Sequence, residues 1–198
     1  PRLVCESPEA RSLEFALYHQ FTNLELFDDD KVVPDYFPVG IGGYFHPFGH
    51  EISRVTATDS HGHNLGHQFQ HVIHDLEDDA ELLGPSTFGV DKAGALEHLR
   101  LAQDTFGDIL PARLVGRCLY ATPTQHIVHL MGMETMFFSM YDYPDEFKTM
   151  MDRLADDTIA YFKLMEREGC ILPTVSFETL CQGSKCFTHT LPQEGVLT

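Results

Sequence analysis

The chain has 198 residues, with 30 acidic and 13 basic side chains, so its formal net charge is −17 at pH 7. With 43% hydrophobic and 22% charged residues, its composition is that of an ordinary globular protein. A chain this acidic lacks the basic surface that binding to nucleic acid or to an anionic membrane requires. Its apolar runs also fall short of the roughly 20 residues that a membrane-spanning helix needs. We therefore expect neither nucleic acid nor a membrane as a partner.

The cysteines and the N-terminus indicate the cellular compartment of the protein and whether the chain is a fragment. Five cysteines stand at widely spaced positions, namely Cys5, Cys118, Cys170, Cys181 and Cys186. An odd, scattered set does not indicate a disulfide framework and fits a reducing compartment. Because no signal peptide precedes the first elements, we expect a cytoplasmic protein. The chain starts at Pro1 without a methionine, which we interpret as the sign of a fragment.

The N-terminal half begins with one clear helix and then becomes irregular. Ser7-Pro8-Glu9 starts the helix, because Ser caps free N–H groups and Pro is favoured at the first helical position. Residues 31–39 favour a strand, which two prolines restrict to an irregular or edge position. Residues 40–43, which are rich in glycine, are predicted as a loop or as backbone that another segment approaches closely. Residues 44–74 have no clean period, and an acidic helical turn follows at residues 75–81.

The C-terminal half is regular. The predicted elements are a helix from Asp91 to Phe106, a strand from Ile109 to Tyr120, a helix from about Thr124 to Met140, a helix from Pro144 to Gly169, and a strand from Cys170 to Phe177. Two strands of buried type joined through helices form a βαβ crossover, which implies parallel pairing. We therefore predict an α/β fold with a parallel sheet. It forms a single partial domain over 1–198, irregular and His-rich over 1–90 and built of regular βα units over 91–198.

Histidines are concentrated in one segment. Seven of them lie within 29 residues: His46, His50, His61, His63, His67, His71 and His74. His61-Gly62-His63 is an H-x-H pair, and the last three have the spacing of one helical face. Such spacings suit zinc or non-haem iron, but no complete ligand pattern accompanies them. We interpret the segment as an exposed polar loop and keep metal binding as the alternative.

Polar side chains follow both predicted strands of the C-terminal half. Glu178 and Thr179 come directly after the second strand, while Gln125, His126 and His129 follow the first. Ligands of parallel α/β sheets gather at the carboxyl ends of the strands. A carboxylate and imidazoles placed there can exchange protons with a substrate. A structural role would explain the same residues without a function. Glu178 could cap or pair locally, and the histidines could be ordinary surface or core residues.

Several motifs along the C-terminal half resemble the uroporphyrinogen decarboxylase superfamily. They are Tyr141-Asp142-Tyr143-Pro144-Asp145-Glu146-Phe147, the helix that follows through Met151-Asp152-Arg153-Leu154, Gly107-Asp108-Ile109-Leu110-Pro111, Leu130-Met131-Gly132-Met133-Glu134, Phe48-Gly49-His50-Glu51-Ile52, and the segments 182–188 and 191–192. The resemblance covers about residues 35–195. It implies a (β/α)₈ barrel of the TIM type, of which this chain supplies only the middle part. The family's N-terminal arginine-bearing loop and its C-terminal histidine strand are missing, which also points to a fragment.

The resemblance assigns roles to particular residues. It places Glu178 and His129 as catalytic, and Thr179, His126, Gln125 and Gly40 as substrate-binding. The family's pyrrole-binding Asp falls near Gly40, where this chain has none, and a pocket Tyr falls at His129. Thr179 replaces a pocket Ser and keeps the hydroxyl group.

These departures weaken a decarboxylase role. The resemblance then implies corrinoid-linked methyl transfer to a thiol such as coenzyme M, with uroporphyrinogen decarboxylation in haem biosynthesis as the alternative. A methyltransferase would use a corrinoid, and zinc bound outside this fragment, whereas a decarboxylase would need no cofactor. The implied partners are a small tetrapyrrole or methyl donor, a corrinoid protein and, as one allowed assembly, a second copy in a homodimer. A metal-dependent enzyme built on His61 and His63, or an inactive half-barrel remnant, stays open, and the fragment alone is expected to be inactive.

The net charge bears on the substrate. A polycarboxylate such as uroporphyrinogen needs concentrated positive charge in its receptor. Arg113 and Arg117 are the paired cations near the predicted pocket, and strand alternation puts both on one side of the sheet. We interpret them as ion-pair partners of an acidic surface, so a polyanion would have to be attracted by a segment outside this chain.

Overall fold

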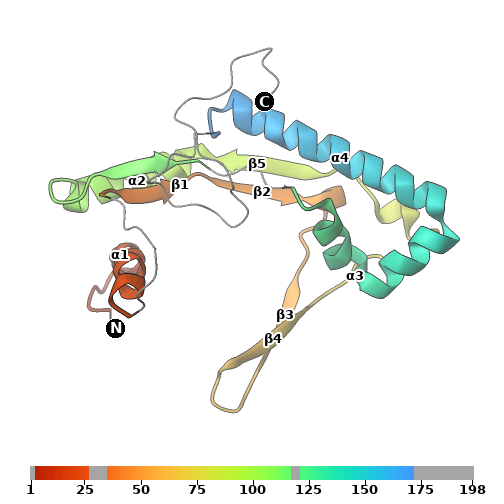
Figure 1. The fold of residues 1–198 in the computed structure, drawn as a ribbon, viewed down its shortest axis with the longest axis horizontal. Coiled ribbons are helices and arrows are strands. Elements are labelled where there is room, and N and C mark those ends of the chain that lie inside the picture. The colour runs from red at the N-terminus through yellow and green to blue at the C-terminus, as the bar shows by residue number, and fades with distance from the viewer. Residues whose placement is uncertain (1–2, 27–34, 117–120, 172–198) are drawn as a thin grey trace. The chain divides into compact units, whose positions relative to one another are not determined.

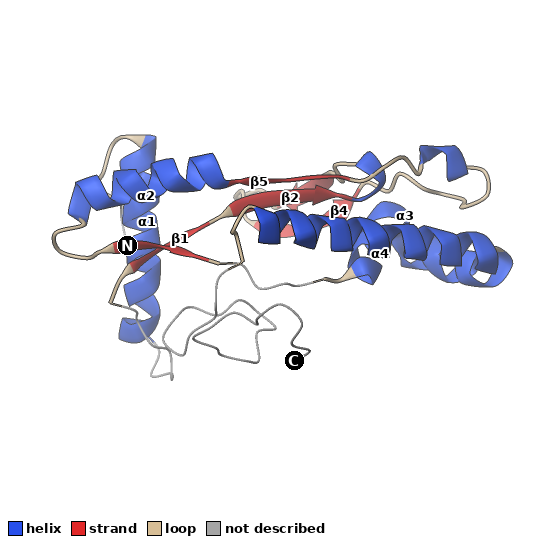
Figure 2. Ribbon diagram, turned by 90° about the horizontal axis from the view of Figure 1, so that it is seen from above, coloured by secondary structure: helices blue, strands red, loops and turns tan. Residues whose placement is uncertain are grey.

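The computed structural model describes residues 3–26, 35–116 and 121–171. Figures 1 and 2 show the order of the elements: α1 (Pro8–Leu26), β1 (Phe37–Gly40), β2 (Gly42–His46), the 3₁₀ turn η1 (Pro47–Gly49), β3 (Arg54–Thr58), β4 (Asn64–Phe69), the 3₁₀ turn η2 (Ala80–Leu82), β5 (Thr87–Asp91), α2 (Lys92–Phe106), β6 (Ala112–Val115), α3 (Pro123–Asp142) and α4 (Pro144–Arg167). The chain divides into two compact units. Unit 1 comprises residues 1–42, 91–118 and 169–198, and unit 2 comprises residues 43–90 and 119–168.

Unit 1 is built around a parallel pair of strands. β1 pairs with β6 in a register that runs from Phe37 opposite Ala112 to Gly40 opposite Val115. Helices α1 and α2 contribute Leu13 and Ala102 to the core of this unit, in which both residues are buried with the strand residues Phe37, Val39 and Ala112. A parallel pair next to helices confirms the predicted α/β class.

Both helices of unit 1 begin at the predicted residues. The Ser7 hydroxyl accepts a hydrogen bond from the Ala10 N–H at 3.2 Å, which caps α1. The Asp91 carboxylate accepts one from the Gly94 N–H at 2.8 Å and caps α2 in the same way. Helix α2 ends at Phe106, as its apolar period predicted.

The strand predicted over 109–120 is shorter than expected. Strand β6 covers only Ala112–Val115, and residues 117–120 lie outside the described part of the chain. The N–H groups of Ile109 and Leu110 both bond to the carbonyl of Phe106, so these two residues finish the turn after α2. Ile109 is 82% exposed. The apolar run therefore contains the end of a turn as well as a strand.

Unit 2 contains the sheet β2–β5, and its start decides between the two alternatives for residues 40–43. These residues are not a loop, because Gly40 ends β1 and Gly42 begins β2 around the buried Ile41. The glycines serve a close approach, since a Cβ on Gly43 would lie 2.6 Å from the Tyr161 hydroxyl and 3.1 Å from the Gly89 carbonyl. The residues allow tight packing between a strand and a helix rather than a turn.

The core of unit 2 lies between α3, α4 and the segment before β5. Its buried members are Phe48, Ile73, Leu76, Ile127, Leu130, Met131, Met136, Met150 and Leu154. Both predicted helices are confirmed, with α4 running to Arg167 and Gly169 following at a positive φ of 66°. Helix α3 is interrupted at Gly132, whose φ of 78° and ψ of 162° are not helical. No feature of the sequence pattern predicted this break.

Strands β3 and β4 form an antiparallel hairpin, visible in Figure 1 as a two-stranded ribbon. His67 lies on β4, whereas His71 and His74 follow it in irregular chain, so the three histidines with helical spacing do not share a helical face. The physical reason is the hairpin: its backbone hydrogen bonds impose a period of two on residues 64–69.

Among the described residues, the strands form three two-stranded sheets and no closed barrel. The strand predicted over Cys170–Phe177 lies almost wholly outside the described residues, which stop at Ile171. No described helix combines the length and apolar character needed to cross a membrane.

Candidate functional site

The first turns of α3 carry three of the residues predicted to line a site. Figure 2 shows α3 as one of the two long helices of unit 2. The imidazole of His126 is half-buried, and its ring centre lies 5.3 Å from that of Phe45 on β2. Phe45 in turn contacts Phe88 of β5 at 5.9 Å and Tyr161 of α4 at 5.7 Å between ring centres. His126 is therefore the polar edge of an aromatic cluster that joins β2, β5, α3 and α4.

His129 lies one turn further along α3 and contacts the hairpin. Its imidazole stacks on Phe69 of β4, with ring centres 3.7 Å apart and an interplanar angle of 26°. The Nε2 atom of His129 lies 2.6 Å from the Nε2 atom of Gln125. With the amide assigned in this orientation, Gln125 donates to His129 and holds its ring as the Nδ1–H tautomer.

Both imidazoles are poised to stay neutral. Burial lowers the pKa of His126, and the neighbouring His129 lowers it further. Burial also lowers the pKa of His129, with additional repulsion from His67 and His71. Clustered imidazoles disfavour one another's protonated form because each added proton would face a like charge. A neutral imidazole has one lone pair, and that of His129 already accepts the hydrogen bond from Gln125. A bound molecule must displace the Gln125 amide before His129 can take up a proton.

The chain after β4 fixes the hairpin to α3 at the helix break. The N–H groups of Val72 and Ile73 both donate to the carbonyl of Leu130, at 2.7 Å and 3.2 Å. A Cβ on Gly132 would lie 2.7 Å from Cε1 of His71, so the missing side chain makes room for this imidazole. The break in α3 thus frees a carbonyl for the incoming chain and brings His71 next to the helix.

The remaining predicted site residues are not part of this group. Gly40 belongs to unit 1, where it ends β1, and a Cβ added to it would have nothing within 4 Å. Glu178 and Thr179 lie outside the described residues. Arg113 is exposed, and its guanidinium lies 5.1 Å from the ring centre of Tyr36. The ion-pair role of Arg113 stays a prediction, and Arg117 lies outside the described residues.

The described part of the chain does not by itself assemble a complete metal site. No group of three or more His, Cys, Asp or Glu side chains within residues 3–26, 35–116 and 121–171 is arranged to hold a metal ion. We therefore derive no step of a reaction through a metal held by these residues alone.

The sequence did not reveal the aromatic partners of the two imidazoles. Tyr161 fitted the core stripe of its helix, and Phe45 and Phe69 stood in a segment without a period. Side chains from three separate segments meet only after the chain has folded, so no spacing could have indicated them.

Each unit also has a hollow that the predictions did not include. In unit 1, a mostly apolar pocket of about 370 Å³ lies between α1 and α2, and its walls include Leu13, Leu17 and Phe106. In unit 2, a pocket of about 270 Å³ is lined by Leu83, Asp145 and Arg153 among others. The Arg153 guanidinium donates hydrogen bonds to the carbonyls of Leu83 and Gly84, at 2.8 Å and 3.0 Å. This cationic group is therefore already hydrogen-bonded to the backbone.

Comparisons with known proteins add no relative: no protein-family model, curated protein or solved structure matches the chain.

Proposed function

We propose that the chain is part of a uroporphyrinogen decarboxylase-like enzyme that acts in corrinoid-linked methyl transfer to a thiol. The observation that supports this proposal is the pair His126 and His129 at the start of α3, at the position where the resemblance expects pocket residues. Both rings have a lowered pKa and lie against aromatic side chains. A parallel strand pair next to helices is the arrangement from which a (β/α)₈ barrel is built, and we propose that β1 and β6 belong to one.

The chemistry needs a base for the thiol. When the thiol sulfur bonds to the methyl carbon of a methylated corrinoid substrate, the thiol proton must leave and the carbon–cobalt electron pair stays with the cobalt, which goes from Co(III) to Co(I). We propose that the bound substrate displaces the Gln125 amide from Nε2 of His129, and that this nitrogen then accepts the proton. Before the substrate binds, the hydrogen bond from Gln125 orients the His129 ring; once the substrate is bound, Gln125 and His126 contact it.

Charge favours methyl transfer over the decarboxylation of a polycarboxylate. The chain carries a net charge of −17, which repels a highly anionic substrate. A small thiol and an uncharged methyl group avoid most of this repulsion. We therefore propose methyl transfer and keep uroporphyrinogen decarboxylation as the alternative reaction.

Two parallel assays distinguish these reactions. The full-length enzyme that contains this chain is incubated with methylcobalamin and coenzyme M, and the change in corrinoid absorbance is followed. In parallel the same enzyme is incubated with uroporphyrinogen, and the porphyrins are separated by chromatography. We expect thiol methylation, with a rate at least about 100-fold lower in His129→Ala, because a positioned base contributes roughly that factor or more. His74→Ala, which changes an exposed histidine outside α3, is the control and should keep the parent rate. Loss of carboxyl groups from uroporphyrinogen without thiol methylation, or an unaffected His129→Ala rate, would contradict the proposal.

A further inference from the structure

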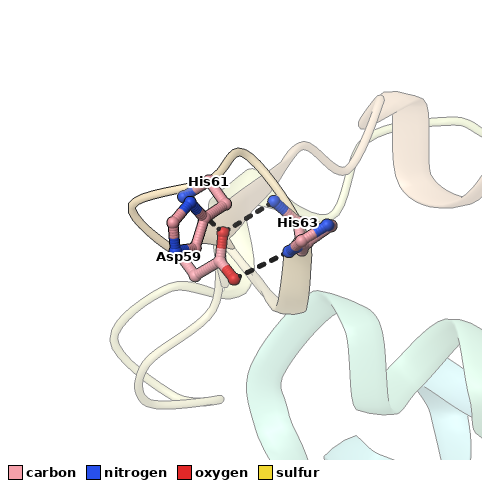
Figure 3. Close-up of polar contacts among 3 residues, drawn as sticks. All are labelled: Asp59, His61 and His63. Atoms are coloured by element: carbon pink, nitrogen blue, oxygen red, sulfur yellow. Dashed lines mark hydrogen bonds and ion pairs between the residues drawn. The ribbon is translucent and has the colours of Figure 1, made fainter.

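The tip of the β3–β4 hairpin holds a second histidine pair, separate from α3. Figure 3 shows how Asp59 organises it. One carboxylate oxygen, Oδ1, accepts hydrogen bonds from the backbone N–H groups of His61 and His63, both at 2.8 Å. The other oxygen, Oδ2, lies 2.9 Å from Nδ1 of His63. A single carboxylate thus fixes the backbone of the H-x-H turn and the ring of its second histidine.

This arrangement sets the tautomer of His63. A carboxylate can only accept a hydrogen bond, so Nδ1 of His63 must carry the proton that it donates. The lone pair is then left on Nε2, and the side chain of His63 is 77% exposed. In protein metal sites, a ligating histidine typically donates its other ring N–H to a carboxylate in this way. Asp59 therefore prepares His63 to bind a metal through Nε2.

His61 lies at a distance that suits a shared ion. The ring centres of His61 and His63 are 6.2 Å apart. With zinc–nitrogen bonds of about 2.0–2.1 Å, two imidazoles on one tetrahedral ion have ring centres roughly 5 Å apart. Both side chains are exposed, so a rotation of one ring closes the remaining distance without disturbing any packed group.

Two imidazoles are only half of a tetrahedral zinc site. No third His, Cys, Asp or Glu side chain in the described part of the chain is placed to join them. The hairpin itself has room for a partner: every residue of β3 is exposed, and on β4 only Phe69 is partly buried. Isolated two-stranded hairpins are marginally stable in water, so a contact at the tip would stabilise this one. Residues 54–69 contain one Arg and one Asp, so two tips can approach without net repulsion between them.

We propose that His61 and His63 form half of a four-histidine zinc site, and that the same pair from a second copy of the chain completes it. The site joins two hairpin tips through one Zn²⁺ ion, with Asp59 of each copy as the positioning residue. It is independent of the methyl-transfer proposal, because none of its residues lies on α3.

The test is the oligomeric state with and without zinc. Sedimentation velocity is measured on the protein with EDTA and then with ZnCl₂, and bound zinc is counted by titration calorimetry. We expect zinc to double the sedimenting mass at one ion per two chains, and EDTA to reverse the change. MgCl₂ should not do so, because Mg²⁺ prefers oxygen ligands.

Three variants separate this site from the other histidines. His61→Ala/His63→Ala should lose the zinc-dependent doubling, while the control His74→Ala should keep it. Asp59→Asn tests the positioning role: its amide oxygen can still accept from the backbone, but its NH₂ group donates to Nδ1 of His63 and moves the ring proton to Nε2. We expect zinc affinity to fall about 10- to 100-fold, as for other residues that support a metal ligand. Circular dichroism checks that each variant keeps the parent fold.

Two results would overturn the proposal. Zinc-dependent doubling that persists in His61→Ala/His63→Ala would place the metal elsewhere. One zinc bound per chain at His61 and His63, with no change in mass, would show that the second copy is not needed.

Discussion

At the scale of single residues, neighbouring side chains decide what the histidines can do. His126 and His63 are both imidazoles on an acidic chain, yet His126 is half-buried beside Phe45, whereas His63 is exposed and held by Asp59. Burial lowers the pKa of His126. The hydrogen bond from His63 is the largest cause that lowers the pKa of the Asp59 carboxyl. The same residue type thus has a lowered pKa where it is half-buried and is oriented by a carboxylate where it is exposed.

The lowered pKa of His126 predicts how stability depends on pH. The pKa of the unfolded chain should be near the ordinary value of 6.5, and the folded value is lower. As the pH falls below about 6.5, the unfolded state takes up the proton first, so stability decreases until the folded pKa is passed. Above pH 6.5 both states are neutral at this residue and it contributes no pH dependence.

Denaturant unfolding of the parent protein and His126→Gln at pH 7.5 and pH 5.5 measures this contribution. The variant should lose less stability than the parent over the interval, because a glutamine cannot take up the proton. His74→Gln is the control for the loss of an exposed histidine. Equal losses in the parent and in His126→Gln would contradict the prediction.

At the scale of elements, the bounds of the helices agreed better with the sequence pattern than the bounds of the strands did. Helices α2 and α4 have long apolar stripes and clear ends, so both ends of α2 and the start of α4 could be predicted. Strand β6 has four residues, and its short apolar pattern also fits a turn. The break at Gly132 was missed because it depends on the approach of His71 from another segment.

Gly43 provides a test of packing between elements. In Gly43→Ala, the added Cβ would lie 2.6 Å from the Tyr161 hydroxyl and 3.1 Å from the Gly89 carbonyl of β5, so the Tyr161 ring and the neighbouring strand have to shift. We expect a loss of about 1–3 kcal/mol in the free energy of unfolding, as for other overpacked sites. Gly40→Ala is the matched control, since a Cβ there meets nothing within 4 Å. Chemical denaturation should find the control within about 1 kcal/mol of the parent, and an equal loss in both variants would refute the explanation.

At the scale of the whole molecule, two cores are assembled from interleaved stretches of chain. Unit 1 takes its core from α1, β1, α2 and β6, while unit 2 takes its core from α3, α4 and residues between β2 and β5. The chain passes from unit 1 to unit 2 and back twice, so neither unit is a continuous piece of sequence.

Separate cores predict separate local stabilities. Leu154 is fully buried in the core of unit 2, and Leu154→Ala should cost about 2–5 kcal/mol through the cavity that it leaves. Hydrogen exchange followed by mass spectrometry should show faster exchange in α3 and α4, with little change in α2. Equal acceleration in α2 would mean that the two cores unfold as one cooperative unit.

The sequence by itself determined the α/β class, the helices with strong periods, the caps at Ser7 and Asp91, and the exposed character of His61 and His63. These depend on neighbouring residues and on a regular period, which the order of amino acids contains directly. Only the tertiary structure decided that β1 pairs with β6, that His126 and His129 lie against Phe45 and Phe69, and that Asp59 orients His63. Such contacts join segments whose separation follows no fixed period, or they depend on the conformation of a turn, so they exist only once the backbone has folded.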